Sequence, residues 1–208
     1  MRTKTYHHGN LANALLDAAD ALLLDHSFAE LTLRQVAAAV GVAPSAAYHH
    51  FADRNALLDA LAARALDALA DALDERLARI PKADAQRRLV ALGRVYVAWA
   101  RHQPHRFEAA FGSQRGRPDV PANLRPYKLL ESLLDDAVIR EILLPDARRH
   151  AELILWPALH GLAVLASSGP LLEKSEREVA GLCDNLVLTI LAGLNARVHP
   201  TSSDDDGP

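Results

Sequence analysis

A glycine at position 41 limits the possible folds of this chain more than any other residue, because it divides a helical pattern into two short pieces. Thr32 and Gln35, three residues apart at the start of the first piece, form the pattern of a capping box. Gly41 ends this helix after about two turns, and Pro44 begins another at a first-turn position. Apolar residues at helical spacing give the first helix one face for burial: Leu33, Val36, Ala37 and Val40. The sequence therefore predicts two short helices joined by a tight turn.

This pattern meets the requirements of a helix-turn-helix, in which a second short helix crosses the first steeply. Ala37 supplies the small residue at the crossing, Gly41 tolerates the left-handed turn, and Val42 anchors the chain after it. A helix that enters a DNA major groove, about 12 Å wide, must expose small or polar side chains. Residues 44–49 meet that requirement. Two short helices in an ordinary α-helical domain would show the same turn, so the wider sequence has to decide.

Residues 31–58 read LTLRQVAAAVGVAPSAAYHHFADRNALL. This block resembles the DNA-binding domain of the TetR family of bacterial transcription regulators. The shared features are a Thr at the helix start, the Gly-Val turn, the step from Tyr48 to Phe51, and a basic residue three positions later. Residues 6–11, YHHGNL, resemble the first segment of one branch of the family. The resemblance covers roughly the first sixty residues and implies a regulator that binds double-stranded DNA.

The resemblance also implies which side chains contact DNA. Tyr48 and His49 stand where the family contacts the DNA backbone and bases, and Ser45 with Ala46 faces the groove. Arg54 stands where the family usually has Lys, and a cation at a helix start can bind a phosphate. The complete set of expected DNA-binding residues is Thr32, Arg34, Pro44, Ser45, Ala46, Tyr48, His49 and Arg54.

Two residues depart from the family pattern. Ala43 stands where the family often has a Ser that caps the recognition helix, and Ala47 is smaller than the branched residue usual at its position. Residues 44–50 also include no Arg, Lys, Asn or Gln, which are the side chains suited to bidentate base contacts. We therefore expect Tyr48, the N-terminal arm and DNA shape to contribute to specificity.

Composition predicts an all-α fold, because Ala and Leu dominate the chain and aromatic residues make up only 5% of it. The formal net charge of −3 is unusual for a nucleic-acid-binding protein. The first sixty residues carry four Lys or Arg against six Asp or Glu. DNA binding must therefore depend on where the charges lie rather than on their sum.

Breaker residues divide the chain into four parts. A long fourth helix, which ends at Ile80-Pro81, joins the second part to the third. We predict a flexible arm over 1–9, a helix-turn-helix domain over 10–66, a helical effector-binding and dimerisation domain over 82–198, and a disordered tail over 199–208. The helices expected in the third part cover 85–102, 104–111, 123 or 126 to 143, 145–168, and 175–197.

Aromatic residues in the third part suggest where a small molecule would bind. Trp156, His160 and Gly161 resemble a Trp-x-x-x-His-Gly signature of one C-terminal domain type in the family. Pairs four or three residues apart share helix faces. The candidate ligand-binding residues are Tyr96, Trp99, Phe107, Phe111, Trp156 and His160. Core packing is the commoner role of such residues, and His160 could equally be a satisfied core histidine, a donor to a ligand or a dimer contact.

The last two helices are the predicted homodimer interface. A twofold dimer places two recognition helices at half-sites about 34–36 Å apart. The apolar residues expected there are Val164, Leu165, Leu182, Leu186, Ile190 and Leu194. Small residues that would permit close approach are Ala163, Gly181 and Gly193.

Two rival classes are weighed against a regulator. An all-helical enzyme or small-molecule-binding protein would have no DNA role, but the sequence contains no phosphate-binding Gly-rich loop, no Gly-x-Ser-x-Gly and no paired carboxylates in an apolar setting. The histidines have no Cys or carboxylate neighbours at ligand spacing. We therefore expect no catalysis, metal or cofactor. A protein-binding adaptor would favour a larger apolar face than the cluster of Tyr48, His49 and Arg54.

Cys183 is the only cysteine, so no intrachain disulfide forms, which fits a reducing cytoplasm. No unbroken run of about 18 apolar residues predicts a membrane span. We expect a ligand-responsive repressor that binds a palindromic operator as a dimer. A small molecule would shift the fourth helix and change the spacing of the recognition helices. The sequence leaves the effector, the operator and an activating role open.

Overall fold

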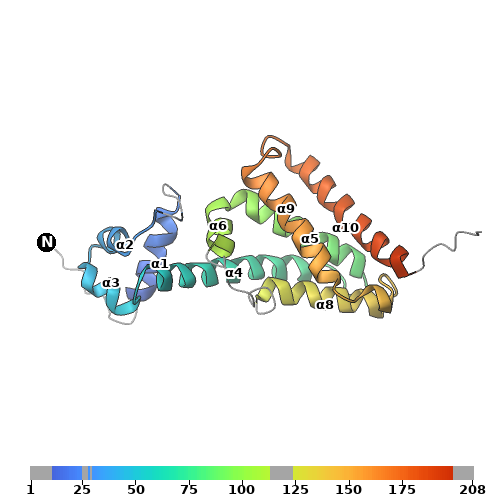
Figure 1. The fold of residues 1–208 in the computed structure, drawn as a ribbon, viewed down its shortest axis with the longest axis horizontal. Coiled ribbons are helices and arrows are strands. Elements are labelled where there is room, and N and C mark those ends of the chain that lie inside the picture. The colour runs from blue at the N-terminus through green and yellow to red at the C-terminus, as the bar shows by residue number, and fades with distance from the viewer. Residues whose placement is uncertain (1–10, 25–27, 29, 113–123, 199–208) are drawn as a thin grey trace, which may run out of the picture. The chain divides into compact units, whose positions relative to one another are not determined.

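The structure is a computed structural model that describes residues 11–24, 28, 30–112 and 124–198. Every regular element in these ranges is a helix, so the predicted all-α class is confirmed (Figure 1). The chain forms two compact units, one from residues 1–68 and 103–120, the other from 69–102 and 121–208. The predicted arm and the predicted tail lie outside the described residues, and the predicted domain boundaries stay a prediction.

The N-terminal unit is built around a small helical core. Its elements are α1 (Leu11–Leu22), α2 (Leu33–Val40), α3 (Pro44–His50), the first part of α4 (Arg54–Ala78) and α6 (Pro104–Gly112). Leu15 and Ala19 of α1 pack in one cluster with Val36 of α2 and Leu57 of α4. Ala109 of α6 belongs to the same cluster. A helix that follows α5 in sequence is therefore part of the core that supports the helix-turn-helix.

The C-terminal unit is arranged around α5. Its elements are the rest of α4, α5 (Ala85–His102), α8 (Arg125–Ile139), the short 3-10 helix η1 (Pro145–Ala147), α9 (Ala151–Ser168) and α10 (Glu176–Val198). Helix α5 packs against α8, α9 and α10. A Cβ at Gly93 would lie 2.9 Å from Cys183 Sγ and 3.0 Å from Leu159 Cδ2. Glycine at this position therefore permits α5 to pack closely against both α9 and α10.

The helix predicted to reach residue 143 ends earlier, at Ile139. The chain turns there, and the N–H of Ile142 donates to the carbonyl of Ala137 at 2.9 Å. Asn195 of α10 donates to the Ile142 carbonyl at 3.0 Å and stabilises the turn. Leu143 is fully buried after the turn. Its apolar character continued the helical pattern in the sequence, although the backbone had already left the helix.

The helix predicted to begin at Pro145 also has a different start. Pro145 opens only the short helix η1, and α9 begins at Ala151. Between them His150 has a φ of 60° and a ψ of 20°, which is left-handed backbone. A residue in that conformation cannot continue a right-handed helix, so the predicted single helix of 145–168 is divided in two.

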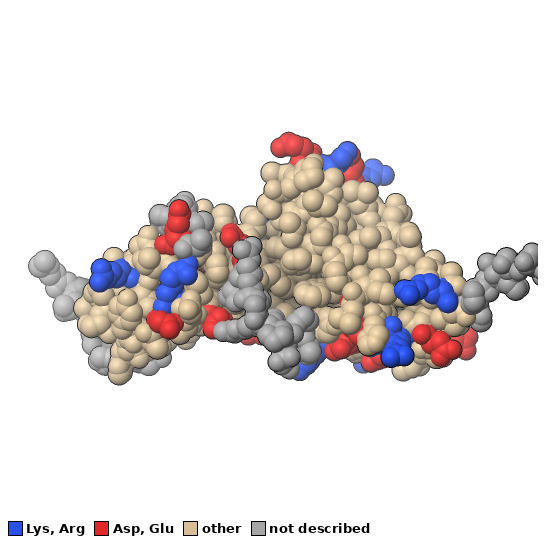
Figure 2. Space-filling model, in the orientation of Figure 1, with Lys and Arg blue, Asp and Glu red and all other residues tan. Residues whose placement is uncertain are grey.

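Helices α9 and α10 are long and apolar enough to cross a membrane by length and composition, although neither contains an unbroken apolar run. Only 28% of each apolar window is buried, and one or two such helices are weak evidence for a membrane protein. Figure 2 shows no charged residue over the middle of these helices in the view drawn. Large apolar side chains are exposed on the two helices: Leu153, Ile154, Val164, Leu165, Leu182 and Leu188.

The structure divides the residues predicted for the dimer interface into three groups. Val164, Leu165 and Leu182 are exposed by 40–44%. Leu186 and Ile190 are partly buried. The prediction was wrong for two others, which are buried within the protomer: Leu194 and Ala163.

Candidate nucleic-acid interface

The start of α2 and the turn after it have the predicted geometry. The N–H of Thr32 donates to Gln35 Oε1 at 2.8 Å, and the N–H of Gln35 donates to Thr32 Oγ1 at 3.3 Å, which confirms the capping box. Gly41 has a φ of 81° and a ψ of 30°, and its N–H donates to the carbonyl of Ala37 at 3.0 Å. Residues other than glycine rarely adopt this backbone φ. The glycine therefore fixes the direction in which α3 leaves α2.

Small buried residues permit α2 and α3 to pack together. Ala37 of α2 and Ala47 of α3 have no exposed surface. Phe51 ends α3 and is buried in the same core. Ala43 stands at the N-cap of α3 without a side-chain hydrogen bond to the helix. In the first turn of α3, Pro44 has no N–H to be capped, and the N–H of Ala46 donates to the carbonyl of Ala43 at 2.9 Å.

The expected DNA-contacting residues of α2 and α3 are mostly exposed. Tyr48 has 48% of its surface exposed, whereas a tyrosine that serves core packing is largely buried. Ala46 is only partly buried. The exposed members of the predicted set on and beside these helices are Thr32, Arg34, Pro44, Ser45, Tyr48 and His49.

Arg54 has a role that the sequence did not reveal. Its Nε donates to the carbonyl of Leu31 at 2.7 Å, and its Nη2 donates to the carbonyl of Phe28 at 2.8 Å. The guanidinium therefore ties the start of α4 to the connection between α1 and α2. Asp53 caps the same helix end by accepting from the N–H of Ala56 at 2.8 Å. A phosphate contact by Arg54 stays a prediction, and any such contact would add to this structural role.

Charges of both signs share the surface of the N-terminal unit. Figure 2 shows Lys and Arg beside Asp and Glu on the visible face of this unit, rather than one basic patch. Two of the arginines form ion pairs within the unit, Arg64 with Asp17 and Arg106 with Asp20. The expectation that local placement of charge, and not its sum, governs DNA binding stays a prediction.

Four of the six predicted ligand-binding residues lie in the C-terminal unit. The Tyr96 hydroxyl and His160 Nδ1 share a hydrogen bond of 2.9 Å, and the rings of Trp156 and His160 are 5.8 Å apart. Tyr96 is 3% exposed, and burial raises its pKa well above the ordinary value. Burial also lowers the pKa of His160. Both groups are therefore neutral near pH 7, and the structure gives His160 the partner expected of a satisfied core histidine.

The other aromatic residues are placed differently. Trp99 of α5 is partly buried in the C-terminal unit. Phe107 and Phe111 lie on α6 in the N-terminal unit, with ring centroids 4.9 Å apart. The six residues therefore do not form one cluster within either unit, and their role in ligand binding stays a prediction.

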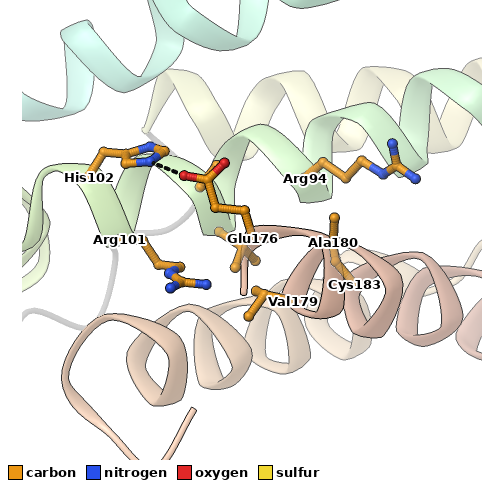
Figure 3. Close-up of a pocket in the computed structure, with 9 residues that line it drawn as sticks. Arg94, Arg101, His102, Glu176, Val179, Ala180 and Cys183 are labelled. Carbon is orange, nitrogen blue, oxygen red and sulfur yellow. Dashed lines mark hydrogen bonds and ion pairs between the residues drawn. The ribbon is translucent and has the colours of Figure 1, made fainter. Parts of the chain in front are cut away.

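A cavity that the sequence did not reveal lies in the C-terminal unit between α5 and α10 (Figure 3). None of the six aromatic candidates lines it. Its residues come from positions 94–102 and 176–183, which no sequence motif joins. The sequence offers one weak indication of this cavity, the cations Arg101 and His102 in the last turn of α5. Cations are favourable in the last turn of any helix, so these two residues alone do not indicate a binding site.

Comparison with known proteins gives matches over both units. Residues 15–61 match the family model described as bacterial regulatory proteins of the tetR family. Residues 89–190 match the model described as the tetracyclin repressor-like C-terminal domain. This second match does not test the Trp-x-x-x-His-Gly type, which stays a prediction. No curated protein matches the chain.

Solved structures share the fold over nearly the whole chain. A protein of unknown function from Rhodococcus sp. RHA1 is 29% identical with a TM-score of 0.77, covering 93% of this chain and 100% of its own. A TetR-family transcriptional regulator from Streptomyces coelicolor is 22% identical with a TM-score of 0.67, covering 90% and 98%. The fatty acid degradation regulator FadR from Bacillus halodurans is 16% identical with a TM-score of 0.69, covering 87% and 98%.

The left-handed Gly41 turn, the exposed face of α3 and the two family matches all lead to one assignment. The chain belongs to the TetR family and is a DNA-binding transcriptional regulator with a helix-turn-helix.

Proposed function

We propose that this regulator is a cytoplasmic, homodimeric repressor that binds a palindromic operator and responds to a small molecule. The observation that carries the DNA-binding part is the exposed face of α3, where Tyr48 projects beside the small residues Ser45 and Ala46. Such a face fits a major groove, because bulky side chains would prevent the helix backbone from approaching the bases. Thr32 and Arg34 at the start of α2 contact the DNA backbone, and Tyr48 with His49 contacts backbone and bases.

Dimerisation is supported by the apolar surface of α9 and α10. Exposed leucines and valines on these helices form a surface that a monomer in water rarely keeps uncovered. A second copy of the chain would cover it through a twofold interface, in which each helix pair meets the same pair of the other protomer. A dimer also presents two copies of α3, which a palindromic operator requires.

The DNA-binding proposal is tested by selection from a randomised duplex pool, comparing wild type with Tyr48→Ala. We expect the wild type to enrich a palindrome that the variant does not enrich. Arg177→Ala is the matched surface control, because Arg177 is exposed on α10, and it should retain the wild-type selection. If the wild type enriched no sequence at any salt concentration, the proposal would be contradicted. Binding to phosphates alone does not depend on sequence and weakens steeply with salt, so it would enrich no palindrome.

A further inference from the structure

The cavity between α5 and α10 has a volume of about 150 Å³ and a mainly apolar wall (Figure 3). An apolar protein cavity of about this volume holds one benzene molecule. The apolar side chains that line it are Val97, Ala98, Val179, Ala180 and Cys183. Burial, with the neighbouring Asp184 carboxylate, raises the pKa of the Cys183 thiol to about 12, so this sulfur is a neutral part of the wall.

Arg101 brings to this wall a cation whose hydrogen bonding is incomplete. Its Nη2 donates to the carbonyl of Lys174 at 2.9 Å and to that of Leu172 at 3.3 Å. Its Nη1 is buried and has no hydrogen-bond partner. Within the described part of the chain, both partners of this guanidinium are neutral carbonyls rather than carboxylates. The side chain as a whole is only partly buried, but a buried N–H without an acceptor is unfavourable, and a carboxylate at Nη1 would supply both the acceptor and a counter-charge.

The other charged residues around the cavity already have partners. Arg94 forms a bidentate ion pair with Asp184. His102 Nε2 and Glu176 Oε1 lie 2.9 Å apart, and their side chains are 59% and 78% exposed. Figure 3 shows this pair bridging the two helices. Glu176 is therefore a solvent-exposed acid with a partner, whereas the positive charge of Arg101 is the one left for a ligand.

We propose that this cavity binds a small monocarboxylate, with its carboxylate at Arg101 and an apolar body about the size of a benzene ring among the α5 and α10 side chains. The regulatory meaning of this site rests on the proposed function, because it names the chemical class of the effector. Arg101 and His102 are the last residues of α5, and the chain enters the N-terminal unit at Gln103. A ligand bound at Arg101 therefore contacts the end of α5, directly before the chain continues into the N-terminal unit.

The test is a calorimetric titration of the full chain with benzoate, and with benzyl alcohol as its neutral match. We expect benzoate to bind at one site per chain and at least about tenfold more tightly than benzyl alcohol, since hydrogen bonds to an ionised acceptor are roughly twice as strong as neutral ones. Arg101→Gln should remove that preference. Arg87→Gln is the matched control, because this arginine is exposed on the same helix and does not line the cavity, and it should bind benzoate as the wild type does.

A second variant keeps the guanidinium and fills the space. Ala180→Leu adds bulk to the cavity wall and should abolish benzoate binding while Arg101 is unchanged, so it decides the matter if Arg101→Gln fails to fold. Equal affinity for benzoate and benzyl alcohol, or benzoate binding that survives Ala180→Leu, would overturn the proposal. Retention of the selected DNA is measured separately. Benzoate binding without DNA retention would remove only the proposed repressor role, and DNA retention without benzoate binding would remove only this site.

Discussion

Removing the Arg54 guanidinium should destabilise the DNA-binding unit whether or not DNA is present. The side chain makes two hydrogen bonds, at 2.7 Å and 2.8 Å, to the carbonyls of Leu31 and Phe28. A hydrogen bond to a charged group contributes about 1.5–3 kcal/mol. Because both bonds are only partly buried, water can replace part of what is lost. We expect Arg54→Ala to lower the free energy of unfolding of this unit by about 2–4 kcal/mol.

Arg54→Lys separates this structural role from phosphate binding. Lysine retains the positive charge but lacks the planar fork that reaches two acceptors, so about half of the loss should remain. Hydrogen exchange of the α2 and α3 amides reports the change, since every 1.4 kcal/mol corresponds to about tenfold in protection when exchange follows unfolding. A purely phosphate-binding arginine would leave protection unchanged in both variants.

Arg64→Lys is the matched control within the same helix. Arg64 pairs with Asp17, and their side chains are 46% and 61% exposed. Exposed ion pairs typically contribute less than about 1 kcal/mol, so protection of the same amides should change little. If Arg54→Ala altered protection no more than Arg64→Lys does, the proposed connection between the start of α4 and the residues before α2 would be refuted.

Two further predictions concern the C-terminal unit. Leu182→Glu places a charge on the exposed apolar surface of α10 and should convert the dimer into monomers in sedimentation measurements. The control Ile139→Glu, at the end of α8 where this residue is 78% exposed, should leave the dimer intact. A monomeric wild type would refute the proposed interface. Burial lowers the pKa of His160 in the folded protein. The unfolded chain therefore binds the proton more readily than the folded protein does. The contribution of neutral His160 to stability is complete above the ordinary histidine pKa of 6.5 and is lost as the pH falls below it. Thermal unfolding between pH 7 and 5 should therefore depend less steeply on pH in His160→Gln than in the wild type, and an unchanged dependence would contradict this reasoning.

Local signals were sufficient to predict the helix-turn-helix. The capping pair of Thr32 and Gln35, the glycine at 41 and the proline at 44 act within a few residues of one another, and each has the predicted conformation. The cap at Asp53 and the capping box of Ser175 with Glu178 also join groups three residues apart. Such features are readable because the groups that bond are close in sequence.

The incorrect helix boundaries share one physical cause. Apolar periodicity reports which residues are buried, and burial does not require the backbone to stay helical. Leu143 is buried after α8 has ended, and the turn that puts it there is held by Asn195, more than fifty residues later in the chain. A contact of that range leaves no local pattern, so the sequence extended the helix through a turn.

The α5–α10 cavity lies at the limit of sequence reasoning for the same reason. Gly93 permits α5 to approach the Cys183 region of α10 closely, and Ala98 and Ala180 then leave space that longer side chains would fill. None of these residues alone indicates a cavity. Only their opposition across two helices creates the volume. Among the described residues that line it, Arg101 is the arginine whose partners are neutral carbonyls and whose Nη1 lacks an acceptor. The recognition surface of this regulator follows from short-range chemistry, whereas the effector site we propose follows from the packing of distant helices, which lets the ligand response change while the helix-turn-helix stays the same.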